Sequence, residues 1–577
     1  MDDRDLVSIQ EARTLAHAAR AAQIALAELT QAEIDSIVES MANAATQHAE
    51  ALARIAVDET GYGVAADKVQ KNLFSSKQVY EFIKPIKTVG VVNRLPDRRV
   101  VEIAEPFGVV AAIVPSTNPT STAIYKVLIA LKARCAVIVS PHPKATRCIT
   151  RTVQVMADAA NNAGAPSGSI GWMNTVTLEG TQELMRHRDV SVILATGGMG
   201  LVRSAYSSGK PAYGVGPGNA PSYIESSADL KKATKDIIIG KTFDNGVLCS
   251  SPNSIVVDEV IESEVRRELI NCGAYFLNKD EINKLGKALV TPQRLPSQLL
   301  VGKTATYIAK EVGLTVPDET SVLIAPLEGV GRDYPLSIEK LCPVLSYYVV
   351  RDWREGCERC KEILKYGGMG HTMSIHSKDE QVILEFGLKK PASRICVNTP
   401  TTHGSVGLTT GLDPAMTLGC GGWGGNITSD NISPKHLLNI KRLAYELRPA
   451  VRSTTLENLS YFKSSTEQVD GSGALSPPQS STKSSRSGIS TNALTVRIDR
   501  FLKSHGYEPE NISQPKEKVV QPKKQVSVPK ASPVDFVSEE EVRAALKTGQ
   551  KLLIGNRTIV TPAARELGEE KKIFIFE

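Results

Sequence analysis

One cysteine of the chain lies where a thiol could act as a nucleophile. Cys249 occurs in GKTFDNGVLCSSPNSIVVD, between a glycine-containing turn and a run of β-forming residues. A strand that follows such a loop can hold it rigidly while its side chains stay accessible. The alternative for a free cysteine is a small core residue, and this interpretation suits the other eight of the nine cysteines. Cys249 is therefore the candidate for covalent chemistry, in which a thiolate attacks an electrophilic carbon.

Few other polar side chains could assist this chemistry. Asn118, in IVPSTNPT, carries an amide that could donate hydrogen bonds to a developing oxyanion. Asn-Pro is also a common turn signal, so the functional interpretation depends on the pairing of Asn118 with Cys249. His371 and His376, in GGMGHTMSIHS, could help to transfer a proton, but we interpret them as structural histidines.

Two patterns resemble functional motifs without the context that those motifs need. Cys357 and Cys360 form a CxxC pair in the helical stretch EGCERCKEIL, but no second pair with metal-ligand spacing accompanies them. Residues 61–66, GYGVAA, fit G-x-G-x-x-A, yet they follow the acidic helical stretch IAVDET rather than a strand. Neither a metal site nor a dinucleotide fingerprint is therefore expected at these positions.

Short apolar runs, polar loops and helical segments alternate from residue 107 onward. Helical segments are expected at 122–134 and from about residue 201. Buried apolar runs separated by helices are typical of a parallel, doubly wound α/β sheet, which binds ligands at the carboxyl ends of its strands. The runs are GVVAAIVP (108–115), CAVIVSPHPKA (135–145) and VSVILATGGMG (190–200), and the loops expected to line one crevice are 115–119, 140–144 and 196–200.

Other elements flank this sheet in the sequence. Residues 4–60 show helical periodicity, and 88–105 has two β-rich runs around a Pro-Asp turn, which predicts a hairpin. A second α/β block spans about 226–420 and opens with a helix at 229–241 and a strand at 254–258. These elements must position Cys249 relative to the crevice of the first sheet.

Length and composition exclude several classes of protein. A chain of 577 residues exceeds one hydrophobic core and predicts two or three domains. The net charge of +6 is small and Lys and Arg form no basic stripe, so nucleic-acid binding is not expected. Nine scattered cysteines fit reduced thiols in a cytosol. No long apolar run occurs and the chain starts with Met-Asp-Asp, so we expect a cytoplasmic protein without a membrane contact.

The composition changes near residue 452. Residues 451–489 are rich in Ser, Gly, Pro and Gln, which predicts a disordered linker. Residues 490–507 have apolar side chains on one helical face and predict an amphipathic helix. A Lys/Pro/Gln linker at 508–534 precedes a small segment at 535–577, in which short helices and strands are expected.

Several segments resemble one known family. KTFDNGVLCSS resembles the nucleophile segment of the aldehyde dehydrogenase superfamily. IVPSTNPT resembles its oxyanion-hole segment, LATGGMG its cofactor turn, and EKLCPVLS the segment whose glutamate binds the nicotinamide ribose. SRICVNTPTTHGSVG and LGCGGWGGNITSDNISPKHLLNIKRLA are similar to the CoA-acylating branch. The similarity runs in order from about residue 5 to residue 446.

The resemblance implies an α/β aldehyde dehydrogenase fold with a largely disordered C-terminal extension. It implies a Rossmann-like cofactor domain at 1–225, a catalytic domain at 226–420 that carries Cys249, and a return to the cofactor domain at 421–450. The 88–105 hairpin would join subunits in a homodimer or a dimer of dimers. Cys249 and Asn118 would be catalytic, and the cofactor would be NAD, with NADP left open. The residues implied to bind it are Pro115, Ser140, His142, Pro143, Thr196, Gly197, Gly198, Gly216 and Glu339.

The resemblance also indicates which molecule receives the acyl group. Hydrolytic members of the superfamily carry a glutamate that activates water, whereas Val215, in YGVGPGNAPSYIE, occupies that position here. Valine cannot take a proton, and the thiol of CoA is a better nucleophile than water. We expect conversion of propionaldehyde or acetaldehyde, with CoA and NAD, into acyl-CoA and NADH. A hydrolytic dehydrogenase and a degenerate scaffold are the alternatives. Pro252 and Asn253 stand where the branch usually has Glu-Gln.

The C-terminal extension resembles targeting segments. The resemblance leads us to expect relatives among the CoA-acylating dehydrogenases of bacterial microcompartments, whose enzymes carry short amphipathic encapsulation peptides. This resemblance implies that residues 490–507 dock on shell proteins, that 535–577 makes a second contact, and that the protein lies inside a microcompartment. A tail without a partner is the alternative.

Overall fold

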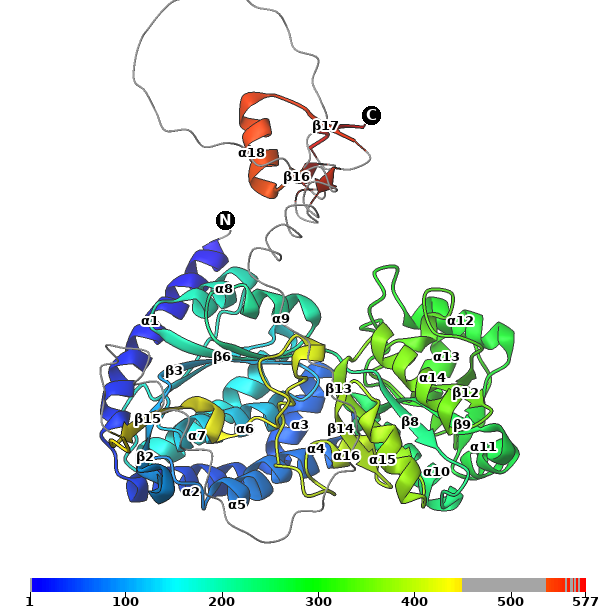
Figure 1. Cartoon of the computed structure of the whole chain (residues 1–577), viewed down its shortest axis with the longest axis horizontal. Coiled ribbons are helices and arrows are strands. Elements are labelled where there is room, and N and C mark those ends of the chain that lie inside the picture. Colours follow the sequence, from blue (N-terminus) through cyan, green and yellow to red (C-terminus); the bar gives the residue numbers. More distant parts are fainter. Residues whose placement is uncertain are drawn as a thin grey trace, which may run out of the picture. The chain divides into compact units, whose positions relative to one another are not determined.

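The computed structural model describes residues 3–448 and, with four short gaps, residues 536–576. The chain divides into two compact units, 1–452 and 453–577 (Figure 1). Each helix within the described ranges is too short or too polar to span a lipid bilayer.

A five-stranded parallel sheet forms the core of the first half of unit 1, in the order β5-β4-β3-β6-β7. Every residue of β3 and β4 is buried, because helices cover both faces of the sheet. The chain proceeds from β3 through β4 to β5 and then returns to β6 beside β3, which creates a topological switch point of the kind that binds ligands. The strands are β3 (Val109–Val114), β4 (Val137–Pro141), β5 (Ile170–Trp172), β6 (Val190–Thr196) and β7 (Ala212–Val215).

The helices of this sheet confirm the predicted strand, loop and helix repeats. The helix expected at 122–134 begins slightly earlier, because Asn118 and Pro119 start it. The helix expected from about 201 likewise begins at Met199. The four helices that follow these strands are α6 (Pro119–Lys132), α7 (Thr146–Asn162), α8 (Leu178–Arg186) and α9 (Met199–Tyr206).

A seven-stranded sheet, parallel throughout, forms the core of the second α/β block, in the order β10-β11-β12-β9-β8-β13-β14 (green in Figure 1). Its strands are β8 (Ala220–Ile224), β9 (Pro252–Asp258), β10 (Ala274–Phe276), β11 (Val322–Pro326), β12 (Val344–Val350), β13 (Gly370–His376) and β14 (Ala392–Val397). The helices of this block are α10 (Leu230–Thr242), α11 (Glu262–Asn271), α12 (Lys279–Leu289), α13 (Ala305–Glu311), α14 (Trp353–Tyr366), α15 (Glu380–Leu388) and α16 (Thr401–Gly404).

The boundary between the two sheets differs from the one predicted after residue 225. Strand β8 was assigned to the first domain, but it pairs with β9 and β13 of the second sheet. The chain therefore passes between the sheets at residues 216–219. The sequence did not reveal this because a short buried strand has the same apolar pattern in either sheet, and only its pairing partners assign it.

The predicted hairpin is confirmed and gains a third strand. β1 (Gly90–Leu95) and β2 (Val100–Pro106) pair antiparallel, and β15 (Leu438–Ala444) pairs with the other edge of β2. The segment after the second block thus returns to the first half of the unit, next to the hairpin, as the proposed 421–450 segment requires.

Helices near the N-terminus pack against the first sheet and its helices. They are α1 (Asp3–Ala27), α2 (Gln31–Gln47), α3 (Ala49–Thr60), α4 (Ala65–Leu73) and α5 (Val79–Ile83). Gly61, the first residue of the GYGVAA pattern, ends α3 in a left-handed conformation with φ of 67°. That pattern therefore follows a helix and precedes α4, as expected for a sequence that is not a dinucleotide fingerprint.

Unit 2 contains a small folded segment. Its elements are β16 (Phe536–Val537), α18 (Glu539–Thr548), β17 (Leu552–Ile554), β18 (Ile559–Val560) and β19 (Phe574–Phe576). The predicted short helix is present, and the strands pair as β16 with β18 and β17 with β19. Val537, Val542 and Ile554 are buried in its core. The predicted linkers at 451–489 and 508–534 and the amphipathic helix at 490–507 lie outside the described residues.

Candidate active site

Cys249 lies in the loop that leads into β9. It is half-buried, whereas seven of the other eight cysteines are buried and Cys272 ends α11 away from this loop. Burial, together with the nearby Glu339 carboxyl and Cys420, raises the pKa of the Cys249 thiol to about 12, and the Arg394 charge opposes this shift. The thiol is therefore protonated at neutral pH, and a nearby group has to accept its proton before the sulfur can attack.

The turn before Cys249 explains the FDNG sequence. Asp244 and Asn245 have left-handed φ angles of 50° and 52°, a conformation that Asp and Asn tolerate better than most residues. The buried Asp244 carboxylate accepts hydrogen bonds from the Val64 backbone N–H at 2.7 Å and from Lys68 Nζ at 2.9 Å. The Asn245 amide donates to the Gly302 carbonyl at 2.9 Å. These bonds fix the turn that presents Cys249.

The segment that crosses between the sheets packs directly on the nucleophile. A Cβ atom added to Gly218 would lie 2.0 Å from the carbonyl oxygen of Cys249, so only glycine fits there. The Gly218 backbone N–H donates to the Glu339 carboxyl at 2.8 Å. Burial raises the pKa of Glu339 to about 7, against the lowering effects of the Gly218 hydrogen bond and of Lys241 and Lys340.

His371 was interpreted as structural, but the structure places it beside this contact. Its ring Cγ lies 3.4 Å from the point where a Gly218 Cβ would stand. Its Nδ1 lies 3.0 Å from the Thr372 hydroxyl, and its Nε2 has no hydrogen-bond partner among the described residues. Burial and the Arg394 charge lower the pKa of His371 to about 3, so the ring is neutral at neutral pH and is a weak base. His376 is also buried, at the end of the same strand.

Strand order explains why these groups meet. Glu339 precedes β12, Cys249 precedes β9, Gly218 precedes β8, and His371 is the second residue of β13. These four strands are neighbours and parallel, so their starts form one edge of the seven-stranded sheet. The site therefore uses the amino edge of the second sheet. No local pattern shows that order, so the sequence left the place of His371 open, with a role in proton transfer as the alternative to a structural one.

Asn118 reaches this region from the carboxyl edge of the first sheet. It follows β3, precedes α6 and is 9% exposed. Lys71 Nζ donates to its Oδ1 at 2.7 Å, and the same ammonium forms an ion pair with Asp244 in the turn before Cys249. The predicted oxyanion donor and the nucleophile turn are thus joined through one lysine of α4. Lys71 was not among the residues predicted for the site.

The predicted cofactor loops occupy the expected edge. Pro115, Ser140, Thr196 and the 142–143 turn lie at the carboxyl ends of β3, β4 and β6. The Thr196 hydroxyl is buried without a partner among the described residues, so it could receive a ligand. The Ser140 hydroxyl instead forms a hydrogen bond with the Thr181 hydroxyl at 3.0 Å in the core, so a ligand would have to compete with this bond. His142 Nδ1 accepts a hydrogen bond from the Lys144 backbone N–H at 3.1 Å.

Three glycines lie near the carboxyl ends of β6 and β7 in the first sheet. Gly198 lies directly before α9, and the Gly197 backbone N–H donates to the Val215 carbonyl at 3.3 Å. A Cβ on Gly216 would lie 2.9 Å from the Met199 sulfur, so the chain passes closely over the start of α9. Val215 ends β7 and its side chain is buried.

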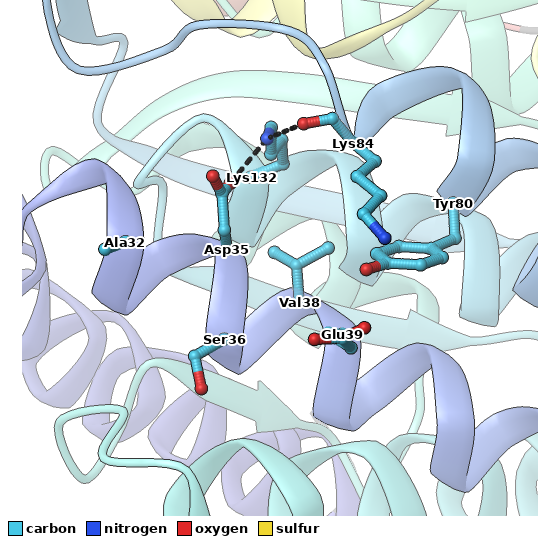
Figure 2. A pocket seen from close by; sticks show the side chains of 8 residues that line it. All are labelled: Ala32, Asp35, Ser36, Val38, Glu39, Tyr80, Lys84 and Lys132. Atoms are coloured by element: carbon cyan, nitrogen blue, oxygen red, sulfur yellow. Dashed lines mark hydrogen bonds and ion pairs between the residues drawn. The ribbon is translucent and has the colours of Figure 1, made fainter.

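A hollow of about 240 Å³ lies elsewhere, against α2 and α5 (Figure 2). In it Lys132 forms an ion pair with Asp35 at 2.6 Å and donates to the Lys84 carbonyl at 2.9 Å. None of the predicted site residues lines this hollow.

Comparison with curated proteins identifies relatives of this chain. Residues 6–281 match the aldehyde dehydrogenase family. The bifunctional aldehyde-alcohol dehydrogenase AdhE of Escherichia coli (strain K12) is 40% identical over 444 residues, which are 76% of this chain and 50% of that protein. The chain thus spans about half the length of this relative. The succinate-semialdehyde dehydrogenase (acetylating) of Clostridium kluyveri is 38% identical over 440 residues, 76% of this chain and 96% of that protein.

Solved structures of aldehyde dehydrogenases are also similar to this chain. An acetylating aldehyde dehydrogenase from Geobacillus thermoglucosidasius is 49% identical, with a TM-score of 0.77 over 78% of this chain and 100% of that one. A propionaldehyde dehydrogenase from the Clostridium phytofermentans fucose utilisation bacterial microcompartment is 27% identical, with a TM-score of 0.69 over 77% of this chain and 99% of that one. Because the acetylating relative from Clostridium kluyveri is covered over 96% of its length at 38% identity, this chain belongs to the aldehyde dehydrogenase family.

Proposed function

We propose that this chain is a CoA-acylating aldehyde dehydrogenase. The overall reaction is aldehyde plus CoA plus NAD⁺ to acyl-CoA plus NADH plus a proton. The observation that carries the proposal is a half-buried Cys249 on a constrained turn, combined with the apolar Val215 in place of a water-activating acid. The acetylating relatives support the choice of CoA as the acyl acceptor.

The reaction begins with removal of the Cys249 proton. Burial keeps the thiol neutral, so its proton has to pass to a neighbouring group or to water before the sulfur attacks. The thiolate adds to the aldehyde carbon, and the carbonyl oxygen becomes an oxyanion. The Asn118 amide and the Cys249 backbone N–H are the donors proposed to hold it. One such donor is worth about 10²–10³ in rate.

The carboxyl edge of the first sheet fits a dinucleotide. The start of α9 at Gly198 offers backbone N–H groups for a pyrophosphate, and the buried Thr196 hydroxyl has no other partner among the described residues. When bound, the nicotinamide accepts the hydride that leaves the aldehyde carbon. An acyl thioester then remains on Cys249. The CoA thiolate attacks its carbonyl carbon and the Cys249 thiolate leaves, which restores the enzyme.

One feature favours a hydrolytic dehydrogenase as the second candidate. Glu339 is a buried carboxyl near Cys249 whose pKa is raised to about 7, so it could serve as a base for water. Its carboxyl already accepts the Gly218 N–H, however, and the family pattern assigns it to the nicotinamide ribose. Hydrolysis would require Glu339 to leave the Gly218 N–H and the ribose and to act as a base for water during the same reaction.

The decisive assay follows NADH formation from propionaldehyde with and without CoA. We expect steady turnover only with CoA, and acyl-CoA as the product by mass spectrometry. Equal turnover without CoA, with free acid as the product, would establish the hydrolytic alternative. Cys249→Ala should abolish NADH formation in both conditions. If Cys249→Ala kept its activity, the thioester mechanism would be wrong. The scaffold alternative would be wrong as well, because a degenerate domain has no activity.

We also propose finer properties of the enzyme. The substrate would be propionaldehyde or acetaldehyde, with NAD as the preferred cofactor, and the sheet formed by β1, β2 and β15 would join subunits of a homodimer or dimer of dimers. We propose that this cytoplasmic enzyme attaches to microcompartment shell proteins through residues 490–507 and 535–577. The similarity to a propionaldehyde dehydrogenase from a bacterial microcompartment supports this proposal. Deletion of 450–577 should leave turnover intact and disperse the enzyme from shells. Unchanged co-localisation would refute the targeting proposal.

A further inference from the structure

A buried cluster of charges joins the two halves of the site. Lys68 and Lys71 of α4 are 1% and 4% exposed, and Asp244 is fully buried. Both ammonium groups pair with the Asp244 carboxylate. Removing charges from water costs several kcal/mol per ion, of which a buried pair recovers only part. A cluster of this kind is weak evidence for stability, so its position beside the reacting groups calls for another explanation.

Lys71 is the member that contacts the predicted oxyanion donor. Its Nζ lies 2.7 Å from Asn118 Oδ1. An ammonium group has three donors and no acceptor, so only the oxygen end of the amide can face it. The Asn118 NH₂ group is thereby held on the opposite side, where one of its two N–H donors bonds the Thr117 hydroxyl at 3.3 Å and the second is left for the aldehyde oxygen. A rotated amide would place NH₂ against the ammonium and lose the hydrogen bond.

Asp244 anchors this lysine to the nucleophile turn. Asp244 lies five residues before Cys249, in the left-handed turn, and its carboxylate also accepts the Val64 N–H. Lys68 Nζ further donates to the Thr117 carbonyl, next to Asn118, at 3.4 Å. The cluster thus connects the loop after β3 with the turn before β9 through α4. A shift of one loop relative to the other would have to break these buried bonds.

We propose that Lys71 is a positioning residue of the dehydrogenase reaction. Its ammonium, anchored by Asp244, directs the Asn118 NH₂ group toward the aldehyde oxygen and sets the distance between that amide and the Cys249 turn. This inference rests on the proposed function. Burial lowers the pKa of Lys71 to about 8, and the Asp244 carboxylate counteracts that effect, so the ammonium form prevails at neutral pH.

A double-mutant cycle tests this role in the full-length chain. The variants are Lys71→Met, Asn118→Ala and the double variant, and the readout is the single-turnover rate of NADH formation. We expect each single variant to lose about 10²–10³ in rate, the cost of one oxyanion donor. Because Lys71 would act only through Asn118, the double variant should match Asn118→Ala within about twofold. Losses that multiply in the double variant would overturn the proposal.

Alkylation of Cys249 by iodoacetamide separates positioning from general damage. This reaction develops no carbonyl oxyanion, so Lys71→Met should be alkylated at nearly the wild-type rate. A parallel fall of alkylation and NADH formation would mean that Lys71 supports the Cys249 turn itself, which contradicts the proposal. If Lys71→Met fails to fold, Lys71→Ala admits water in place of the side chain and enters the same cycle.

A buried lysine outside the site supplies the matched control. Lys132 is 1% exposed and is bonded to Asp35 and Lys84 (Figure 2), so Lys132→Met should leave the rate unchanged in folded protein. If the wild type oxidises no aldehyde, the proposed function is wrong. If Asn118→Ala keeps the full rate, Asn118 is not the oxyanion donor. If Asn118→Ala is impaired but Lys71→Met is not, only the role of Lys71 fails.

Discussion

Gly218→Ala would place a methyl group against the main chain of the nucleophile. Its Cβ would lie 2.0 Å from the Cys249 carbonyl oxygen and 3.1 Å from the carbonyl carbon, whereas real Cβ contacts essentially never fall under 3.0 Å. The Cys249 loop would have to move by about 1 Å, a displacement that can cost about 100-fold in the rate of a positioned reaction. We therefore expect kcat for NADH formation to fall about 100-fold.

The assay compares Gly218→Ala with a glycine that has room for a side chain. An added Cβ at Gly411 meets no atom within 4 Å, so Gly411→Ala should keep the wild-type kcat. Thermal unfolding and circular dichroism establish that both variants fold. A folded Gly218→Ala with wild-type kcat would refute the close packing of the crossing segment on Cys249, and with it our account of how the nucleophile is held.

Three further predictions concern reactivity and stability. Since the pKa of Cys249 is raised to about 12, alkylation of Cys249 by iodoacetamide should rise about tenfold per pH unit through neutral pH; a plateau below pH 9, read by peptide mass spectrometry, would contradict this. Glu339→Gln removes a charge that raises the thiol pKa, so alkylation should be faster at a given pH, and a slower reaction would oppose the assignment. Ile138→Ala, at a fully buried position of β4, should reduce the free energy of unfolding by about 2–5 kcal/mol in urea titration, and an unchanged midpoint would exclude this packing.

Local sequence predicted the elements of the first sheet well. The apolar runs ending at Pro115, in the 140–144 loop and at Thr196 became β3, β4 and β6, because helices cover both faces of a parallel sheet and leave uninterrupted apolar strands. The hairpin around Pro96 was equally visible, since a turn between two β-rich runs is a local signal. The position of β8 was not predictable, because its membership depends on distant strands.

The residues of the candidate site also fall into two groups, those that local sequence indicated and those that it did not. Cys249, Asn118 and Glu339 were named from segments whose local sequences resemble a family, and their catalytic roles stay predictions. His371 and Lys71 were not assigned roles, because neither has a local signal beyond an ordinary histidine and a helical lysine. Their places depend on which strands become neighbours and on where α4 packs.

The sequence by itself determined which residue types were present: a thiol on a glycine-containing turn, an amide after a buried strand, and no acid at Val215. These are properties of short segments, and they define what chemistry is available. Tertiary structure decided which of those groups meet. It aligned the starts of β12, β9, β8 and β13, and brought Lys71 between Asn118 and Asp244. Strand order and helix packing are set by burial of apolar surface between distant segments, so residue spacing does not encode them locally.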